Sequence, residues 1–140
     1  MIAGSLALAF AAALTGAALY CNWVEQPSRL ALDDAALLSE WGPSDQRGFA
    51  LAGALALISA VTGLSAYFSS GDVRFAIGAA FVILTWPYAY FIMSPLNNQI
   101  LTLRPRDVGA ARELVRQWGL LEYGQTGIAV GATAVFLWAL

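Results

Sequence analysis

The chain has 140 residues, of which 59% are hydrophobic and 11% charged, and its mean hydropathy is +0.66. A soluble domain usually has about 25% charged residues, so this composition indicates a membrane protein. The chain has no His and a single Cys, which excludes a His-based triad, a His metal site and an internal disulfide. The net charge of −2 argues against a surface that binds nucleic acid.

The charged residues are confined to short segments of the chain. A helix of roughly 20 apolar residues crosses the hydrocarbon core of a bilayer, and its backbone groups bond within the helix. Four blocks carry no charge and are long enough, or nearly so, to do this: 1–24, 48–71, 75–103 and 123–140. We therefore expect one all-α domain over 1–140, an antiparallel four-helix membrane bundle with spans at about 2–24, 46–69, 73–94 and 119–140.

Two connections have amphipathic patterns of their own. Residues 28–47 follow the first span, and we expect a short interfacial helix there that is capped by Asp33 and broken at Gly42-Pro43. Residues 105–118 follow the third span and place apolar side chains on one face and charged side chains on the other. We expect both helices to lie at the membrane boundary.

Three prolines mark bends or ends of the predicted spans. Pro87 lies inside the third span and has no N–H to donate to the carbonyl of Ile83, so we expect a kink there. Pro27 and Pro95 follow the apolar runs of the first and third spans, and we expect each to end its span.

The fourth span contains a GxxxG motif at Gly127 and Gly131. In membranes, small residues at this spacing let two helices approach closely. The motif is consistent with packing inside the bundle or with a homodimer through these two glycines.

The arginines predict the orientation of the chain. Six of the seven lie in the connections after the first and third spans, and Arg74 lies on the opposite side. The positive-inside rule places the Arg-rich side in the cytoplasm. We expect an integral protein of a bacterial inner or cell membrane, with both termini on the non-cytoplasmic side.

Polar and aromatic side chains gather toward the Arg-rich end of the bundle, because antiparallel spans bring their segments together there. One face of the third span carries residues at 4-3-4 spacing, namely Trp86, Tyr90, Met93 and Asn97. We predict an interhelical pocket for a lipophilic aromatic or quinone-like molecule. The candidate ligand-binding residues are Tyr20, Asn22, Arg47, Trp86, Tyr90, Met93, Asn97 and Trp118.

Without His, acid–base chemistry is left to carboxylates and Tyr. Glu25 at the end of the first span and Glu122 at the start of the fourth are the candidate catalytic bases. Each has a purely structural interpretation as well. Glu25 is placed to pair with Arg29, and Glu122 with an arginine such as Arg47 or Arg116. The tryptophans near the boundary are equally consistent with an interfacial aromatic belt.

Motifs for phosphate, nucleotide and metal binding do not occur in the chain. It has no P-loop, GxGxxG, CxxC or HExxH. We expect no metal and no cofactor. The expected partners are the lipid bilayer and a lipophilic aromatic small molecule, and not nucleic acid.

Five short motifs stand in order along the chain. They are Tyr20-x-Asn22-x-Val24-Glu25-Gln26-Pro27, Trp41-x-Pro43-Ser44-x-x-Arg47-Gly48, Trp86-Pro87-Tyr88, Pro95-x-Asn97 and Arg116-x-Trp118. In these residues, and in the order and spacing of its spans, the whole chain resembles the anthrone-oxygenase-like family of small four-helix membrane proteins, also known in bacteria as a domain of unknown function.

The resemblance implies an integral membrane protein. For fungal relatives it implies oxidation of anthrones to anthraquinones by O2 without an obvious metal or flavin, and for bacterial relatives it implies no established activity. Relatives often have a His or Asn, and an Arg three positions later, where this chain has Glu122 and Gln125. A cationic or imidazole group at those positions is therefore not available here.

Two functions of different classes remain open. In the first, the chain is an oxidoreductase or oxygenase in which Glu25 or Glu122 removes a proton, Asn22, Asn97 and Tyr90 donate to an oxyanion, and Glu25→Gln abolishes turnover. In the second, it is a non-enzymatic lipid- or quinone-binding bundle or a dimerising structural subunit. A transporter is a weaker third option, since no span holds a charge at its centre.

Overall fold

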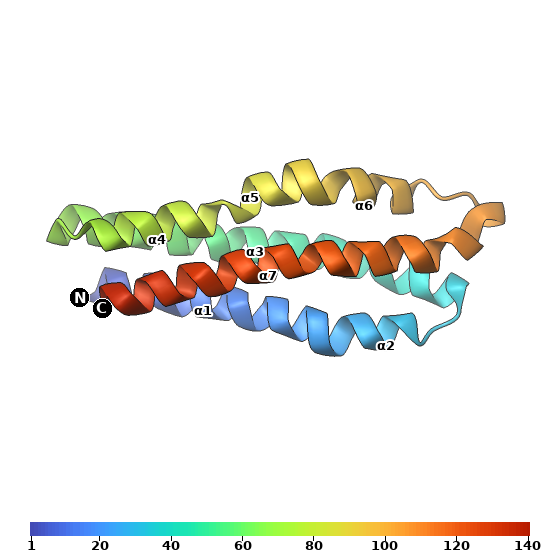
Figure 1. Ribbon diagram of the computed structural model, residues 1–140, viewed down its shortest axis with the longest axis horizontal. Coiled ribbons are helices and arrows are strands. Elements are labelled where there is room, and N and C mark those ends of the chain that lie inside the picture. Colours follow the sequence, from blue (N-terminus) through green and yellow to red (C-terminus); the bar gives the residue numbers. More distant parts are fainter.

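The structure is a computed structural model that describes residues 1–140, and it consists of four long helical rods packed side by side (Figure 1). All four rods are long and apolar enough to cross a membrane, and they cover Ile2–Leu30, Asp34–Ser70, Val73–Leu101 and Pro105–Ala139. The all-α four-helix architecture expected from the uncharged blocks is confirmed.

Three of the rods are built from more than one helical segment. The first contains α1 (Ile2–Tyr20), the π-helical turn η1 (Cys21–Glu25) and α2 (Gln26–Leu30). The second is the single helix α3 (Asp34–Ser70). The third contains α4 (Val73–Ile83), α5 (Thr85–Tyr88), the π-helical turn η2 (Ala89–Met93) and α6 (Ser94–Leu101). The fourth contains the 3-10 helix η3 (Pro105–Ala110) and α7 (Ala111–Ala139).

The half of the bundle next to the two termini, which we call the terminal half, is closely packed. Phe75 and Phe136 are fully buried there among small side chains. A Cβ added at Gly78 would lie 2.6 Å from the ring of Phe136, and one at Gly63 would lie 2.8 Å from it. The glycines therefore make room for an aromatic ring. The core comprises Ala7, Ala11, Leu14, Ala56, Ala60, Ala66, Phe75, Ala79, Val82, Ala129, Ala132, Phe136 and Ala139.

The GxxxG motif is divided between two environments. A Cβ at Gly131 would lie 2.5 Å from the ring of Phe81, so this glycine serves packing within the bundle. Gly127 faces open space. Contact between Gly127 and a second copy of the chain stays a prediction.

The interfacial helix expected over 28–47 is not a separate element, which corrects the sequence prediction. Helix α3 runs without a break through Pro43 and the Gly before it. Proline removes one backbone hydrogen bond from the helix, but Leu37 and Trp41 are almost completely buried and hold this part of α3 against the rest of the bundle. Burial of these two side chains outweighs the local break signal.

The second interfacial helix, expected over 105–118, is also not separate. Only η3 precedes Ala111, and from there α7 continues through the bundle as one helix. Val115 and Trp118 pack in the core instead of facing the membrane boundary. Both connections therefore extend the bundle beyond the predicted spans.

Pro87 interrupts the third rod as predicted. Helix α4 ends at Ile83, the chain makes a turn at Leu84, and α5 begins at Thr85. The direction of the rod changes at this point (Figure 1).

Pro27 and Pro95 do not end their spans, and the π turns explain why. The N–H of Gln26 donates to the carbonyl of Cys21, and the N–H of Ser94 donates to that of Ala89. Each bond reaches five residues back, and its donor is the residue just before a proline. The wider turn accommodates the proline ring and the missing N–H, so the helix continues.

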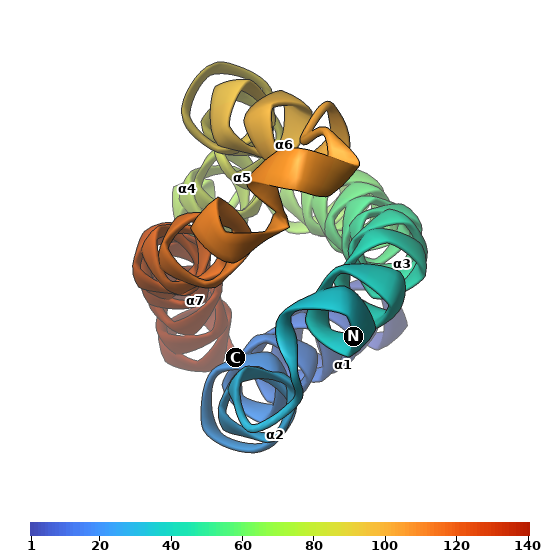
Figure 2. The ribbon, with the colours of Figure 1, turned by 90° about the vertical axis from the view of Figure 1, so that its right-hand side faces the viewer.

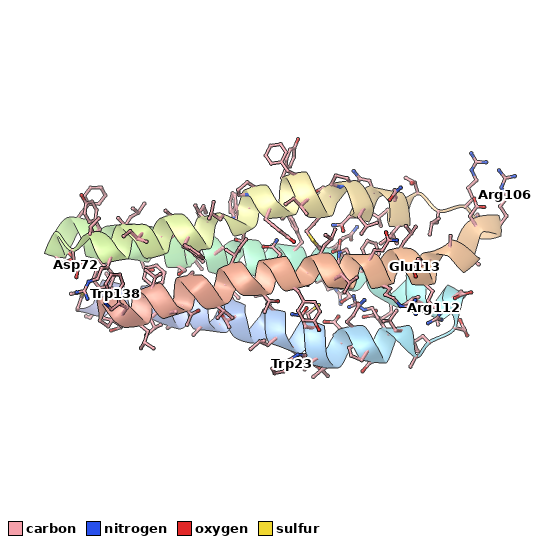
Figure 3. All side chains as sticks on the ribbon, in the orientation of Figure 1. Trp23, Asp72, Arg106, Arg112, Glu113 and Trp138 are labelled. Carbon is pink, nitrogen blue, oxygen red and sulfur yellow. The ribbon has the colours of Figure 1, made fainter.

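Charged side chains lie at both ends of the bundle (Figure 3). Asp72 and Trp138 lie at the end with the termini, where the guanidinium of Arg74 stacks 5.3 Å from the Trp138 ring. Arg106 and Arg112 lie at the opposite end. The Arg-rich connections thus lie together at one end, while the orientation of the bundle across a membrane stays a prediction.

Candidate functional site

The half of the bundle next to the connections, which we call the loop half, contains an open cavity of about 730 Å³. In the view onto this end, the four rods are arranged in a ring (Figure 2). Side chains from all four rods line the cavity, and 16 of the 26 lining residues are hydrophobic. Its apolar end reaches Leu14 and Ala129, and its polar end reaches Arg29 and Ser44.

The structure brings eight of the ten predicted site residues to this cavity. They are Tyr20, Glu25, Trp86, Tyr90, Met93, Asn97, Trp118 and Glu122. The 4-3-4 face predicted on the third rod is thus kept along one side of the cavity.

Asn22 and Arg47 are not brought to the cavity. Asn22 is buried and donates to the hydroxyl of Thr126 on α7 at 2.6 Å. On a regular α-helix Asn22 and Glu25 would lie about 60° apart and share a face. They lie instead within η1, whose wider turn increases that angle and separates the two side chains. Arg47 is exposed on α3.

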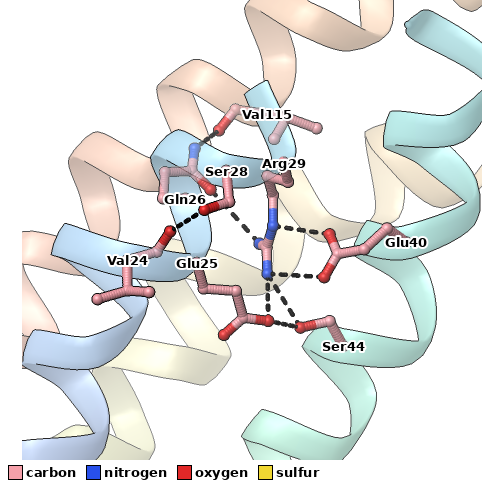
Figure 4. A network of polar contacts seen from close by, with 8 residues as sticks. All are labelled: Val24, Glu25, Gln26, Ser28, Arg29, Glu40, Ser44 and Val115. Atoms are coloured by element: carbon pink, nitrogen blue, oxygen red, sulfur yellow. Dashed lines mark hydrogen bonds and ion pairs between the residues drawn. The ribbon is translucent and has the colours of Figure 1, made fainter. Parts of the chain in front are cut away.

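Arg29 is the centre of a buried polar network at the polar end of the cavity (Figure 4). It is 2% exposed, and its guanidinium lies 2.6 Å from Glu25 and 2.8 Å from Glu40. It also donates to the hydroxyl of Ser44 at 2.9 Å, and Ser44 in turn donates to Glu25. The same guanidinium stacks 5.3 Å from the ring of Trp118. The network joins α2 to α3 and fixes the carboxylate of Glu25.

Glu122 differs from Glu25 in having no such partner. Its carboxylate lines the cavity and forms no hydrogen bond or ion pair in the structure. Arg116, one of its expected partners, pairs with Glu113 at 3.1 Å. The carboxylate of Glu122 therefore remains available to a molecule in the cavity.

Asp45 is a lining residue that sequence reasoning did not select. Its carboxylate accepts a long hydrogen bond of 3.4 Å from the amide of Asn97 and forms no ion pair. A signal for it does exist in the sequence. Glu25, Asp45 and Glu122 each stand at or within three residues of the edge of an uncharged block, so they lie at a similar depth in the bundle.

Three further buried atoms at the cavity have no hydrogen-bond partner. They are the indole N–H of Trp118 and the amide oxygens of Asn97 and Gln125. The Gln125 amide nitrogen donates to the carbonyl of Thr85 at 3.1 Å, which fixes the direction of the free oxygen. Buried polar atoms without partners are uncommon, and here they border an open space that a ligand would fill.

No group of three or more His, Cys, Asp or Glu side chains is arranged to hold a metal ion. The cavity offers carboxylates, amides, an indole N–H and aromatic walls. These groups suit proton transfer and hydrogen bonding to a flat apolar molecule.

Comparison with known proteins identifies a family. A family model described as anthrone oxygenase matches residues 41–135, more than half of the chain. The matched region contains Asp45, Trp118 and Glu122, whereas Glu25 and Arg29 precede it. No curated protein matches the chain, and no solved structure does.

Proposed function

Because the chain belongs to the anthrone oxygenase family, we propose that its cavity binds a lipophilic aromatic of the anthrone type and promotes its oxidation by O2. The observation that carries the proposal is the carboxylate of Glu122, which lacks a partner and lines an aromatic-walled cavity.

The size and lining of the cavity support a tricyclic ligand. Its volume of about 730 Å³ lies within the range of ligand pockets, roughly 300–1,000 Å³. Trp86 and Tyr90 supply aromatic walls, and the apolar end between Leu14 and Ala129 receives the ring edge farthest from the polar groups.

The chemistry requires a base and a means of stabilising an anion. Glu122 removes a proton from the ring CH2 of the anthrone, giving an electron-rich anion that is delocalised onto the ketone oxygen. O2 adds to that carbon and forms a hydroperoxide. Loss of water then leaves a second ketone, so one oxygen atom stays in the quinone and the other leaves as water with the two hydrogens of the CH2.

The remaining polar groups favour the anion. The unpaired N–H of Trp118 is a buried donor at the cavity and is the best candidate to bind the developing oxyanion. Asn97 offers an amide N–H that at present makes only a 3.4 Å contact with Asp45. Glu25 is held by Arg29 and Ser44, so its role is to position that network and not to take the proton.

The test is oxygen uptake with an added anthrone, using the full chain in lipid nanodiscs, with the quinone identified by mass spectrometry. Empty nanodiscs give the background of uncatalysed oxidation. We expect Glu122→Gln to lower turnover by at least about 100-fold, in line with loss of a general base. Glu25→Gln should lower it less, and Glu113→Gln, at an exposed carboxylate outside the cavity, should leave it unchanged.

Unchanged turnover in Glu122→Gln would remove that carboxylate from the mechanism. The alternative function, a non-enzymatic binding protein, is favoured by Glu122 and Gln125 standing where relatives often carry a His or Asn and an Arg. Saturable binding of the anthrone with no oxidation above background would support that alternative.

A further inference from the structure

The charges at the cavity do not balance. Three carboxylates line it, from Glu25, Asp45 and Glu122, against the single cation of Arg29. Arg29 is already shared between Glu25 and Glu40, at 2.6 and 2.8 Å. Asp45 and Glu122 form no ion pair with it and share only its more distant positive charge, while their own carboxylates are close enough to repel each other. Two negative charges in a partly buried space are costly unless a positive group lies beside them or they take up protons.

At the cavity, hydrogen-bond acceptors without a partner also outnumber the donors. The amide oxygens of Asn97 and Gln125 are buried acceptors without donors, and the carboxylates of Asp45 and Glu122 are acceptors as well. Against these four acceptor groups stands one buried donor without a hydrogen bond of normal length, the N–H of Trp118, which faces the carboxylate of Asp45 and whose side chain is 4% exposed. A ligand that satisfies this end of the cavity must supply several N–H or O–H donors.

We propose that the cavity binds an aromatic compound that carries a protonated amine, with the ammonium group held by Asp45 and Glu122. A primary ammonium brings three donors and the missing positive charge in one small group. The amide oxygens of Asn97 and Gln125 accept from the same group, and the aromatic walls at Trp86 and Tyr90 bind the ring. The inference shares with the proposed function the placement of an aromatic ligand in this cavity, but it concerns a cationic ligand distinct from the neutral anthrone and gives Glu122 a binding role.

Three fluorescent probes with one ring system test the inference, since they differ in a single substituent. They are anthracene with an aminomethyl, a hydroxymethyl or a carboxylate group at position 9. Binding is measured by fluorescence anisotropy to the full chain in nanodiscs of zwitterionic lipid, with empty nanodiscs as the control for partitioning. We expect the ammonium probe to bind at least ~10-fold tighter than the hydroxymethyl probe and the carboxylate probe to bind weakest.

The double variant Asp45→Asn and Glu122→Gln keeps the shape of the site and removes both charges. In it, the preference for ammonium over hydroxymethyl should fall below ~3-fold, whereas Glu113→Gln should keep the full preference. Equal or tighter binding of the hydroxymethyl probe to the unmodified chain overturns the inference. That comparison needs no variant, so it decides the matter even if the double variant fails to fold.

The outcome also separates this inference from the proposed function. If a neutral anthrone is oxidised and the three probes bind with equal affinity, the ammonium site is refuted and the oxygenase proposal stands. If the ammonium probe binds tightest and no anthrone is oxidised above background, the ammonium site stands and the oxygenase proposal is refuted.

Discussion

The terminal half and the loop half of the bundle are built from the same four rods but differ in packing. In the terminal half, glycines and alanines let the rods close around the rings of Phe75 and Phe136. In the loop half, the rods stand around a cavity of about 730 Å³, and both π turns lie beside it. The difference indicates that regular helix with small residues gives a closed core, whereas irregular turns before Pro27 and Pro95 accompany an open one.

Removal of the Phe136 ring from the core of the terminal half should lower stability more than any other change considered. Phe136 is fully buried against Gly63 and Gly78, so Phe136→Ala removes packing that nothing nearby replaces. We expect the free energy of unfolding to fall by about 3 kcal/mol, measured by denaturant titration in detergent. Phe91→Ala, at a ring that is 71% exposed, is the matched control and should change it by less than about 0.5 kcal/mol. A similar loss in both variants would contradict a packed terminal core.

Removal of the Arg29 cation from the loop half should have the second largest effect on stability. Arg29→Met keeps the length of the side chain but leaves Glu25 and Glu40 without their partner. These carboxylates are about one-third exposed, so water screens part of the loss, and we expect about 2 kcal/mol and not the 3–5 kcal/mol of a fully buried pair. Arg116→Gln breaks only an exposed pair and should cost less than about 0.5 kcal/mol. Equal effects would show that the Arg29 network has no special structural role.

A methyl group added at Gly119 should weaken the contact between α2 and α7. A Cβ at Gly119 would lie 2.5 Å from the amide nitrogen of Gln26, which donates to the carbonyl of Val115 at 2.8 Å. Gly119→Ala should therefore break that buried bond and lower stability by about 1–2 kcal/mol in the same titration. Gly127→Ala faces open space and should not destabilise the monomer. If Gly127→Ala also weakens self-association in cross-linking, the predicted homodimer gains support.

The smallest expected effect is electrostatic and lies at the exposed turn of the terminal half. Hydrogen bonds from the side chain and backbone of Arg74 lower the pKa of Asp72 below its ordinary value of 3.8. The carboxylate therefore adds stability that is present above pH 3.8 and is lost as the pH falls through the lowered pKa. Asp72→Asn keeps a capping side chain without the charge. It should be slightly less stable than the unmodified chain at pH 7, and the difference should shrink as the pH falls below 3.8. A difference that does not shrink on acidification would contradict this account.

The sequence predicts the architecture and the family well because both depend on patterns that are local in the chain. The uncharged blocks define the four rods, and the kink at Pro87 follows from one missing N–H. The ends of the rods are less predictable. Gly42-Pro43 is a strong local break signal, yet burial of Leu37 and Trp41 carries α3 through it.

The candidate site is partly predictable for the same reason. The four residues at 4-3-4 spacing on the third rod all line the cavity, although the π turn η2 lies among them. The prediction that Asn22 lines the pocket was wrong, because Asn22 and Glu25 both lie in a π turn that no sequence pattern indicated. The importance of Arg29 depends on Glu40 and Ser44, which approach it from another helix. Such a contact depends on the tertiary arrangement and cannot be read from one segment.

The π turns have a consequence for the rotation of the rods. A turn closed by a bond to the fifth residue back contains one residue more than an α-helical turn, so all residues after it are rotated by about 100° relative to an unbroken helix. Turn η1 therefore sets which way Arg29 points, although α1 is anchored by its packing in the terminal half. Ordinary α-helical winding of the unchanged sequence would turn Arg29 away from Glu40, whereas deletion of one residue within η1 would give that winding and leave the direction of Arg29 unchanged. The wide turn thus accommodates one extra residue while the closed core and the open cavity keep their relative rotation.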